Sequence, residues 1–345
     1  MSRADTKIRF VRMLLSAAVL VGIVGGAQAQ DVHMRFSVND RPDGHTAIMA
    51  KDFADGVARR TNGKVKIEVF PNHTLAGGSF KTEIELVRSG GIDMALNSTI
   101  ILGLFVDRKF DVFSLPFMIP NHKVFNKVVE GPMGAKLEEW MKQAGLTPVG
   151  IGINGFRQLT NSKRSITTID DIKGLKFRVA GTEVFLAAFK LMGADAVTMN
   201  AQEMLQAMGT GVVDGQENPF VSILAFRMYE VQKYVTVWNY VVDPMIVYVN
   251  TRKFNSLSPD VQKILMEEGR RAAKVEMELA EKGDIASMEE LKAKGMTITT
   301  PTPAALAEFQ KRFEPLYAQF EDKIGKDNIQ MLRSEAQKAK AALGQ

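Results

Sequence analysis

The sequence of 345 residues contains no cysteine and only four histidines. Without cysteine, the chain has no disulfide bond, no zinc–thiolate site and no thiol nucleophile. No H-E-x-x-H pattern and no G-x-S-x-G segment occurs, so these signatures of zinc proteases and serine hydrolases are missing. The segment 39–44 begins like a calcium loop, but Arg41 and Ala50 stand where oxygen ligands are required. The sequence therefore predicts neither a metal ion nor a cofactor.

Long apolar runs are also missing, except for one near the N-terminus. Basic residues precede an apolar run over residues 13–26, and Ala-Gln-Ala at 27–29 has the form of a cleavage site. This pattern predicts a signal peptide over residues 1–29, cleaved near Ala29, and a periplasmic protein. The run is too short for a membrane-spanning helix. Removal of this segment lowers the net charge from +5 to about +2, so we expect no nucleic-acid partner.

The rest of the chain alternates short β-branched or aromatic runs with amphipathic runs, as α/β proteins do. A helix is predicted at about 46–60, and a second begins at Ser258-Pro259-Asp260 and stays helical in composition to Leu291. Strands are predicted at 32–38, 64–70, 92–96, 147–153, 175–180 and 212–214. A helix as long as the second could brace two lobes.

Two segments resemble each other and favour a two-lobed architecture. Residues 85–97 and 205–218 each run from a helix through glycine to a short apolar strand, an aspartate and a polar tip. Open α/β sheets bind ligands at such strand ends. No low-complexity linker occurs, so the sequence predicts that strands crossing between the lobes join them.

Gly150, Gly152 and Gly155 have the G-x-G-x-x-G spacing of a dinucleotide-binding loop. Such a loop needs a helix directly after its third glycine, but the residues that follow Gly155 have no helical period and end in turn formers. We therefore interpret the three glycines as small residues that allow tight packing where the chain crosses between lobes.

Two arginines stand in unusual places. Arg178 lies near the end of an apolar strand before Gly181, and Arg157 follows the glycine-rich segment. A guanidinium at such a place needs an anionic partner, and its planar fork suits a ligand carboxylate. The alternative is that both arginines are solvated or paired with the protein's own carboxylates.

Several motifs resemble the periplasmic solute-binding proteins of tripartite ATP-independent (TRAP) transporters, the DctP-like group. They are NGFRQLTN (154–161), DIKGLKFRV (171–179), GVVDGQENP (211–219) and YEVQKY (229–234), supported by VFPNHTLAGG and FSLPFMI. The resemblance implies an α/β, two-lobed periplasmic binding protein fold with a hinge and a long C-terminal helix spanning both lobes. It places lobe I at 31–154 plus about 244–283, and lobe II at 155–243 plus about 284–345.

The resemblance also implies a monomeric receptor, not an enzyme, that captures an organic acid by hinge closure for the small and large TRAP permease subunits. It assigns the ligand carboxylate to Arg178 and Arg157, with Asn218 as a further ligand-binding residue. Related sialic-acid binders have a glutamate near Ser98, which this chain lacks, and Met199-Asn200 stands where many members have proline.

Neutral side chains at the expected strand ends favour a sugar acid or a related monocarboxylate, because amides and hydroxyls bind hydroxyl groups. These residues are Asn39, Asn97, Ser98 and Asn239. A C4-dicarboxylate is the alternative if His45, Arg35 or Arg41 supplies a second positive charge, and the resemblance implies a 2-oxo acid as a further alternative. An exported enzyme acting on a carboxylated substrate and a ligand-presenting partner of a sensor remain alternatives to transport.

Overall fold

The computed structural model describes residues 31–345, and its centre is one mixed β-sheet of nine strands. The signal peptide predicted over residues 1–29 lies outside the described residues. The strands are β1 (Val32–Ser37), β2 (Val65–Phe70), β3 (Met94–Ser98), β4 (Leu146–Asn161), β5 (Lys176–Val179), β6 (Asp195–Thr198), β7 (Gly215–Pro219), β8 (Tyr234–Asn250) and β9 (Thr297–Thr299).

The sheet has the strand order β2-β1-β3-β8-β4-β7-β5-β6, with β9 paired to β8. The long strands β4 and β8 are antiparallel neighbours at its centre. On the β8 side, β3 is antiparallel to β8 and parallel to β1. On the β4 side, β7 is antiparallel to β4 and parallel to β5. Two parallel sets of strands therefore flank one central pair, as expected from the two similar segments of the sequence.

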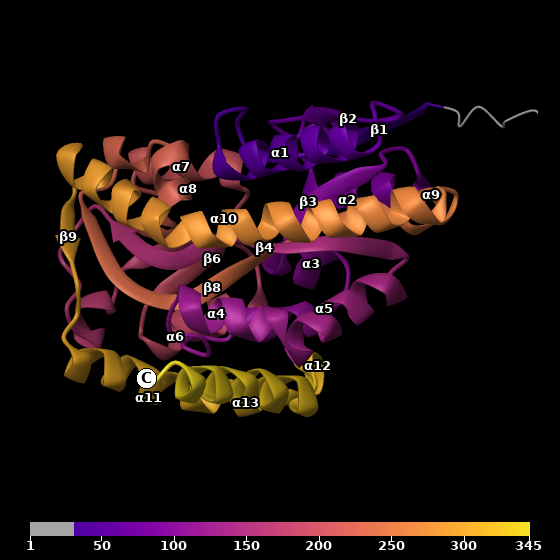
Figure 1. Ribbon diagram of the computed structural model, residues 1–345. Helices are drawn as coiled ribbons and strands as arrows, with labels where there is room; N and C mark the ends of the chain where they lie inside the picture. The colour runs from indigo at the N-terminus through magenta and orange to yellow at the C-terminus, as the bar shows by residue number, and fades with distance from the viewer. Residues whose placement is uncertain (1–30) are drawn as a thin grey trace, which may run out of the picture. The chain divides into compact units, whose positions relative to one another are not determined.

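The helices cover this sheet and connect its strands (Figure 1). They are α1 (His45–Arg60), α2 (Phe80–Ser89), α3 (Thr99–Phe105), α4 (His122–Glu130), α5 (Pro132–Gln143), α6 (Glu183–Leu191), α7 (Ala201–Gly209), α8 (Phe220–Ala225), α9 (Thr251–Asn255), α10 (Pro259–Ala293), α11 (Pro303–Gln319), α12 (Glu321–Ile324) and α13 (Lys326–Ala342).

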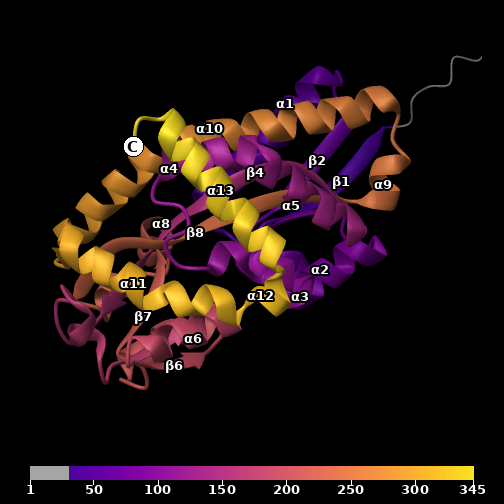
Figure 2. The same cartoon turned by 90° about the horizontal axis from the view of Figure 1, so that it is seen from below.

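The longest helix, α10, has 35 residues and begins with the predicted signal, since Ser258 caps it and Pro259 is its first residue. It packs along β4 and contacts α1, which connects β1 and β2, and α8, which follows β7 on the other side of the central pair (Figures 1 and 2). The predicted long helix that braces both parts of the molecule is confirmed. Three further helices follow it, so it is not the last element of the chain.

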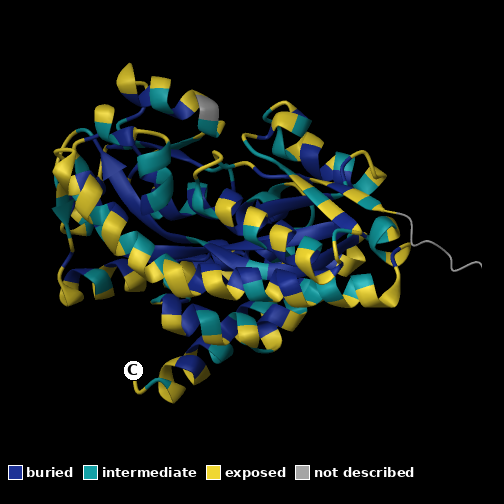
Figure 3. Cartoon of the chain, turned by 45° about the horizontal axis from the view of Figure 1, so that its top comes forward, coloured by how far each residue is buried: buried dark blue, intermediate teal, exposed yellow. Residues whose placement is uncertain are grey.

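Residues 32–345 form one compact unit, and the lobe boundaries given above therefore stay a prediction. The central strands of the sheet are buried and the outer faces of the helices are exposed, as Figure 3 shows. No helix in the described part of the chain has both the length and the apolar character that crossing a membrane requires.

Most predicted elements are present, with two differences. The strand predicted at 147–153 continues through the glycines and Arg157 to Asn161, as one 16-residue strand. The strand predicted at 212–214 is wrong, because these residues form the turn and β7 starts at Gly215. All five residues of β7 are buried although most of them are polar, since the strand lies between β4 and β5. The prediction failed because it placed the strand on the apolar residues 212 and 213 and not on the polar residues of β7 that follow.

The glycines of the G-x-G-x-x-G pattern allow tight packing, as we predicted. A Cβ atom on Gly150 would lie 2.5 Å from the carbonyl oxygen of Gly269 in α10, and one on Gly152 would lie 2.7 Å from Glu276 Oε2. Gly155 has φ +129°, a conformation that other residues rarely adopt, and lies against Pro219 of β7. The first two glycines thus bring α10 onto β4, and the third fits a bulge in β4.

Replacing Gly150 with alanine should therefore destabilise the fold. The added methyl group would overlap the backbone of α10, and overpacking of this kind costs about 1–3 kcal/mol. Gly283→Ala is the matched control, because a Cβ there meets nothing within 4 Å and alanine favours the helix by about 0.5–1 kcal/mol. Thermal unfolding should show a lower Tm for G150A and an unchanged or higher Tm for G283A. Equal Tm values for both variants would contradict the packing role of Gly150.

Glu276 is a buried carboxyl group at the contact between α10 and β4. Its Oε2 accepts the N–H of Ile153 at 3.0 Å, and its Oε1 lies 3.8 Å from His45 Nε2, too far for a hydrogen bond. Burial raises the pKa of Glu276 to about 8. Burial also lowers the pKa of His45, although Asp40 and Asp284 oppose that shift. A protonated Glu276 and a neutral His45 therefore face each other at neutral pH.

The raised pKa of Glu276 should make the stability depend on pH. Between the ordinary pKa of 4.5 and about 8, the folded protein holds a proton that the unfolded chain releases, so stability decreases as the pH rises through this window. Glu276→Gln should remove this contribution, which has a slope of up to about 1.4 kcal/mol per pH unit. Urea unfolding from pH 5 to pH 8 measures it, with exposed Glu278→Gln as control. Parallel stability curves for the wild type and E276Q would refute the assignment.

Candidate ligand-binding site

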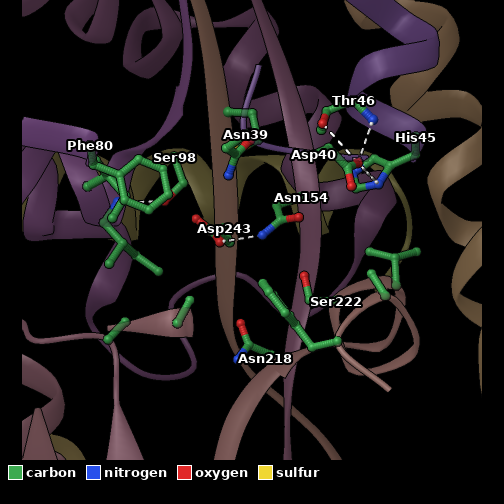
Figure 4. Close-up of a pocket in the computed structure, with 18 of the residues that line it drawn as sticks. Asn39, Asp40, His45, Thr46, Phe80, Ser98, Asn154, Asn218, Ser222 and Asp243 are labelled. Carbon is green, nitrogen blue, oxygen red and sulfur yellow. Dashed lines mark hydrogen bonds and ion pairs between the residues drawn. The ribbon is translucent and has the colours of Figure 1, made fainter. Parts of the chain in front are cut away.

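A cavity of about 350 Å³ lies where the ends of several strands meet the central pair (Figure 4). Most of its lining residues are polar or charged, and apolar side chains come from several elements, among them α3 and α8. The lining residues are Asn39, Asp40, Arg41, His45, Thr46, Asn72, His73, Phe80, Ser98, Ile100, Ile101, Asn154, Arg157, Arg178, Ala180, Ala201, Asn218, Val221, Ser222, Ala225, Phe226, Asp243 and Met245.

The sheet topology explains why these residues meet. Asn39 follows the end of β1, Ser98 ends β3, Arg178 is next to last in β5 and Asn218 is next to last in β7. These are the carboxyl ends of the parallel strands, where α/β sheets bind ligands. Because β4 and β8 join the two parallel sets, the middle of each long strand adds residues between those ends.

Arg178 is a buried cation without a carboxylate partner among the described residues. Its side chain is 5% exposed, and its Nε and Nη2 donate to a single acceptor, the carbonyl oxygen of Met199, at 3.0 and 2.8 Å. Burial lowers the pKa of Arg178 to about 10, and the nearby Arg157 contributes in the same direction. The guanidinium remains charged at neutral pH, so an anion entering the cavity finds an incompletely compensated positive charge.

Arg157, in contrast, is already paired with the protein's own carboxylates. It forms a two-pronged ion pair with Glu217, through Nε and through Nη2 at 2.9 Å, and its Nη1 donates to Asp243 Oδ2 at 3.1 Å. Burial alone would lower the pKa of Arg157, but Glu217 and Asp243 raise it above its ordinary value. This is the alternative that the sequence left open, and it distinguishes Arg157 from Arg178.

Three other predicted site residues line the cavity. Asn218 Oδ1 accepts a hydrogen bond from Arg157 Nη2 at 3.1 Å, and its Nδ2 donates to Gln216. Ser98 caps α3 by accepting the N–H of Ile100 at 3.2 Å. Asn39 lies across the cavity from Asn218 in Figure 4. Their contact with a ligand stays a prediction.

Asn97 and Asn239 do not line the cavity, and the expectation that they contact the ligand needs correction for this site. Asn97 is fully buried, where it donates to Glu83 Oε2 at 2.8 Å and accepts from the hydroxyl of Tyr248. Asn239 has φ +47° beside an irregular part of the β4–β8 pairing, and its Oδ1 accepts from Gln158 Nε2 at 2.6 Å. Side chains alternate along a strand, so Asn97 points away from the face that Ser98 occupies.

The cavity also contains polar residues that the sequence analysis did not assign. Asn154 and Asp243 come from β4 and β8, and Asp40 comes from the loop before α1. Asp243 had a detectable signal, because it is the one charged residue in the 17-residue strand β8. His45 and Arg41, two of the three residues that the sequence analysis considered as a second positive charge for a dicarboxylate, also line the cavity. Arg35 does not, and its side chain donates to the carbonyl oxygen of Gly91.

The basic side chains at the cavity other than Arg178 lie close to the protein's own carboxylates. Arg41 is half exposed and forms two hydrogen bonds with Asp43, at 3.0 and 2.7 Å. His73 Nε2 lies 3.2 Å from the buried Glu83. In residues 31–345, no three or more His, Asp or Glu side chains are grouped so that they could hold a metal ion.

Comparison with known proteins adds independent information. Residues 37–323 match the family model DctP, described as bacterial extracellular solute-binding protein, family 7. A TRAP periplasmic solute-binding protein from Ralstonia eutropha H16 with bound (S)-2-acetolactate is 34% identical, with a TM-score of 0.83 over 89% of this chain and 99% of that chain. The sugar acid binding protein of Advenella mimigardefordensis, in complex with galactonate, is 30% identical, with a TM-score of 0.85 over 90% of this chain and 99% of that chain.

A curated relative has a name that points to another class of acid. The C4-dicarboxylate-binding periplasmic protein of Rhodobacter capsulatus is 28% identical over 89% of this chain and 92% of its own length. The family match covers most of the chain, and the similar structures share its two-lobed α/β fold. The chain therefore belongs to the DctP family of bacterial extracellular solute-binding proteins and has the fold of the periplasmic receptors of TRAP transporters.

Proposed function

We propose that this protein is a periplasmic receptor that captures an organic acid in the cavity and delivers it to the small and large permease subunits of a TRAP transporter. The single observation that carries the proposal is Arg178, a buried guanidinium that lines the cavity and, among the described residues, bonds only to a backbone carbonyl. A ligand carboxylate would supply the missing negative charge through charge-assisted hydrogen bonds. The names of the similar proteins agree with this chemistry, because each of them includes an organic acid.

The distribution of charge favours a sugar acid or related monocarboxylate. A second ligand carboxylate would need a second unpaired cation, since an uncompensated buried charge is costly. Arg157 is paired with Glu217 and Asp243, and Arg41 is paired with Asp43. The remaining polar wall contains amides and hydroxyls, which suit the hydroxyl groups of a sugar acid.

Ligand capture would work by closure of two lobes on the acid. We assign residues 31–154 with about 244–283 to lobe I and residues 155–243 with about 284–345 to lobe II. Asn39 and Ser98 would then contact the ligand from lobe I, while Arg178 and Asn218 would contact it from lobe II. A ligand held from both sides favours the closed form through its higher affinity for that form.

Replacing Arg178 with alanine should abolish tight binding of the acid. Loss of one partner from a buried charge pair costs on the order of 2–5 kcal/mol, which is roughly a 30-fold to several-thousand-fold loss of affinity. Isothermal titration with galactonate, erythronate and succinate measures the effect. Arg178→Lys should recover only part of the affinity, because lysine lacks the planar fork. Wild-type affinity for the preferred acid in folded R178A would disprove the role of Arg178.

Replacing Arg157 with alanine should instead destabilise the protein before any ligand is added. Glu217 and Asp243 would lose their shared cation, and breaking a buried pair costs about 3–5 kcal/mol. Arg178→Ala is the matched comparison, because no carboxylate among the described residues forms an ion pair with Arg178. Thermal unfolding of the ligand-free proteins should give a Tm for R157A that is on the order of 10 °C lower than that of R178A. If R178A unfolded first, our division of roles between the two arginines would be incorrect.

A further inference from the structure

Asp243 lines the cavity, and one of its carboxylate oxygens has no hydrogen-bond partner among the described residues. The residue is 1% exposed, and its Oδ2 accepts from Asn154 Nδ2 at 2.9 Å and from Arg157 Nη1 at 3.1 Å. Its other oxygen, Oδ1, is buried and forms no hydrogen bond within the part of the chain that the structure describes. A buried polar atom without a partner is costly, so a ligand donor that reaches Oδ1 would be favoured.

The strand geometry directs Asp243 toward the ligand. Asp243 and Met245 both line the cavity, and they are two residues apart in β8, where alternate side chains share a face. Figure 4 shows Asp243 in the middle of the site, with Asn39, Ser98 and Asn154 around it. Asp243 therefore belongs to the same cavity as Arg178.

The charge around Asp243 is not fully compensated. Arg157 is one guanidinium shared by two buried carboxylates, Glu217 and Asp243. Burial raises the pKa of Asp243, while Arg157, Asn154 and the hydroxyl of Ser98 oppose that rise. Asp243 therefore brings to the cavity wall a negative charge that Arg157 compensates only in part.

We propose that Asp243 determines specificity by accepting a hydrogen bond from a ligand hydroxyl group and by excluding ligands that bring a second carboxylate. This inference rests on the proposed receptor function and names its ligand class: a hydroxylated monocarboxylate with its carboxylate on Arg178. A second carboxylate at Asp243 would place two negative groups together without a free cation.

Pairs of sugar acids that differ at one end test the proposal. Galactarate is galactonate with its terminal CH₂OH group oxidised to a carboxylate, and meso-tartrate is related to erythronate in the same way. Hexanoate and butyrate have the same chain lengths without hydroxyl groups. Isothermal titration will show which of the two aldonates, galactonate or erythronate, binds more tightly to the wild type. That aldonate should bind at least tenfold more tightly than the corresponding dicarboxylate and the corresponding acid without hydroxyl groups.

Asp243→Asn should then reduce the preference for the aldonate over its dicarboxylate by tenfold or more, because an amide of the same shape is neutral and can donate to a carboxylate. Asp284→Asn is the matched control, since Asp284 pairs with His122 and does not line the cavity. It should leave the preference unchanged. Circular dichroism and Tm show whether each variant is folded. The comparison of ligands on the wild type tests the proposal even if a variant does not fold.

The possible outcomes separate the two levels of the proposal. If the dicarboxylate or the hydroxyl-free acid binds the wild type as tightly as the aldonate, the role of Asp243 is refuted and the receptor function stands. An unchanged preference in folded D243N refutes it too. If no acid binds the wild type, the receptor function fails together with this inference.

Discussion

The antiparallel pairing of β4 and β8 is the interaction on which the rest of the structure depends. These two strands run side by side from Leu146–Asn250 to Asn161–Tyr234, and they carry a parallel set of strands on each outer edge. The carboxyl ends of both sets therefore face the same central pair. Without this pairing, Ser98 at the end of β3 and Asn218 near the end of β7 would have no reason to line one cavity.

Arg157 and Arg178 are buried to a similar extent but differ in ion pairing, because their neighbours differ. Arg157 lies on β4 opposite β7, where Glu217 reaches it across the strands, and Asp243 approaches from β8. Arg178 lies on β5, which is separated from β4 by β7, and its acceptor is the carbonyl oxygen of Met199. The first arginine completes an internal charge cluster. The second remains available to a ligand.

The central strands must also accept a helix at close range. Gly150 and Gly152 let α10 approach the backbone of β4, and Gly269 on α10 lies equally close to Val149. This approach buries Glu276 beside the N–H of Ile153 and places its other oxygen near His45, which lines the cavity. Through Glu276, α10 therefore contacts β4 at Ile153 and lies near His45 at the wall of the cavity.

The sequence by itself determined the α/β class, most strands, the start of α10 and the family, because apolar periodicity, capping residues and motif order are local properties. It also placed Arg178, Asn218, Asn39 and Ser98 at strand ends. Only the tertiary structure decided which polar residues meet. Asn97 and Ser98 are neighbours in the sequence, yet the alternation of β3 sends one to Glu83 and the other to the cavity. Asp243 reaches the site from a strand 65 residues beyond Arg178, and whether Arg157 or Arg178 has a carboxylate partner depends on strand order, which no local pattern encodes.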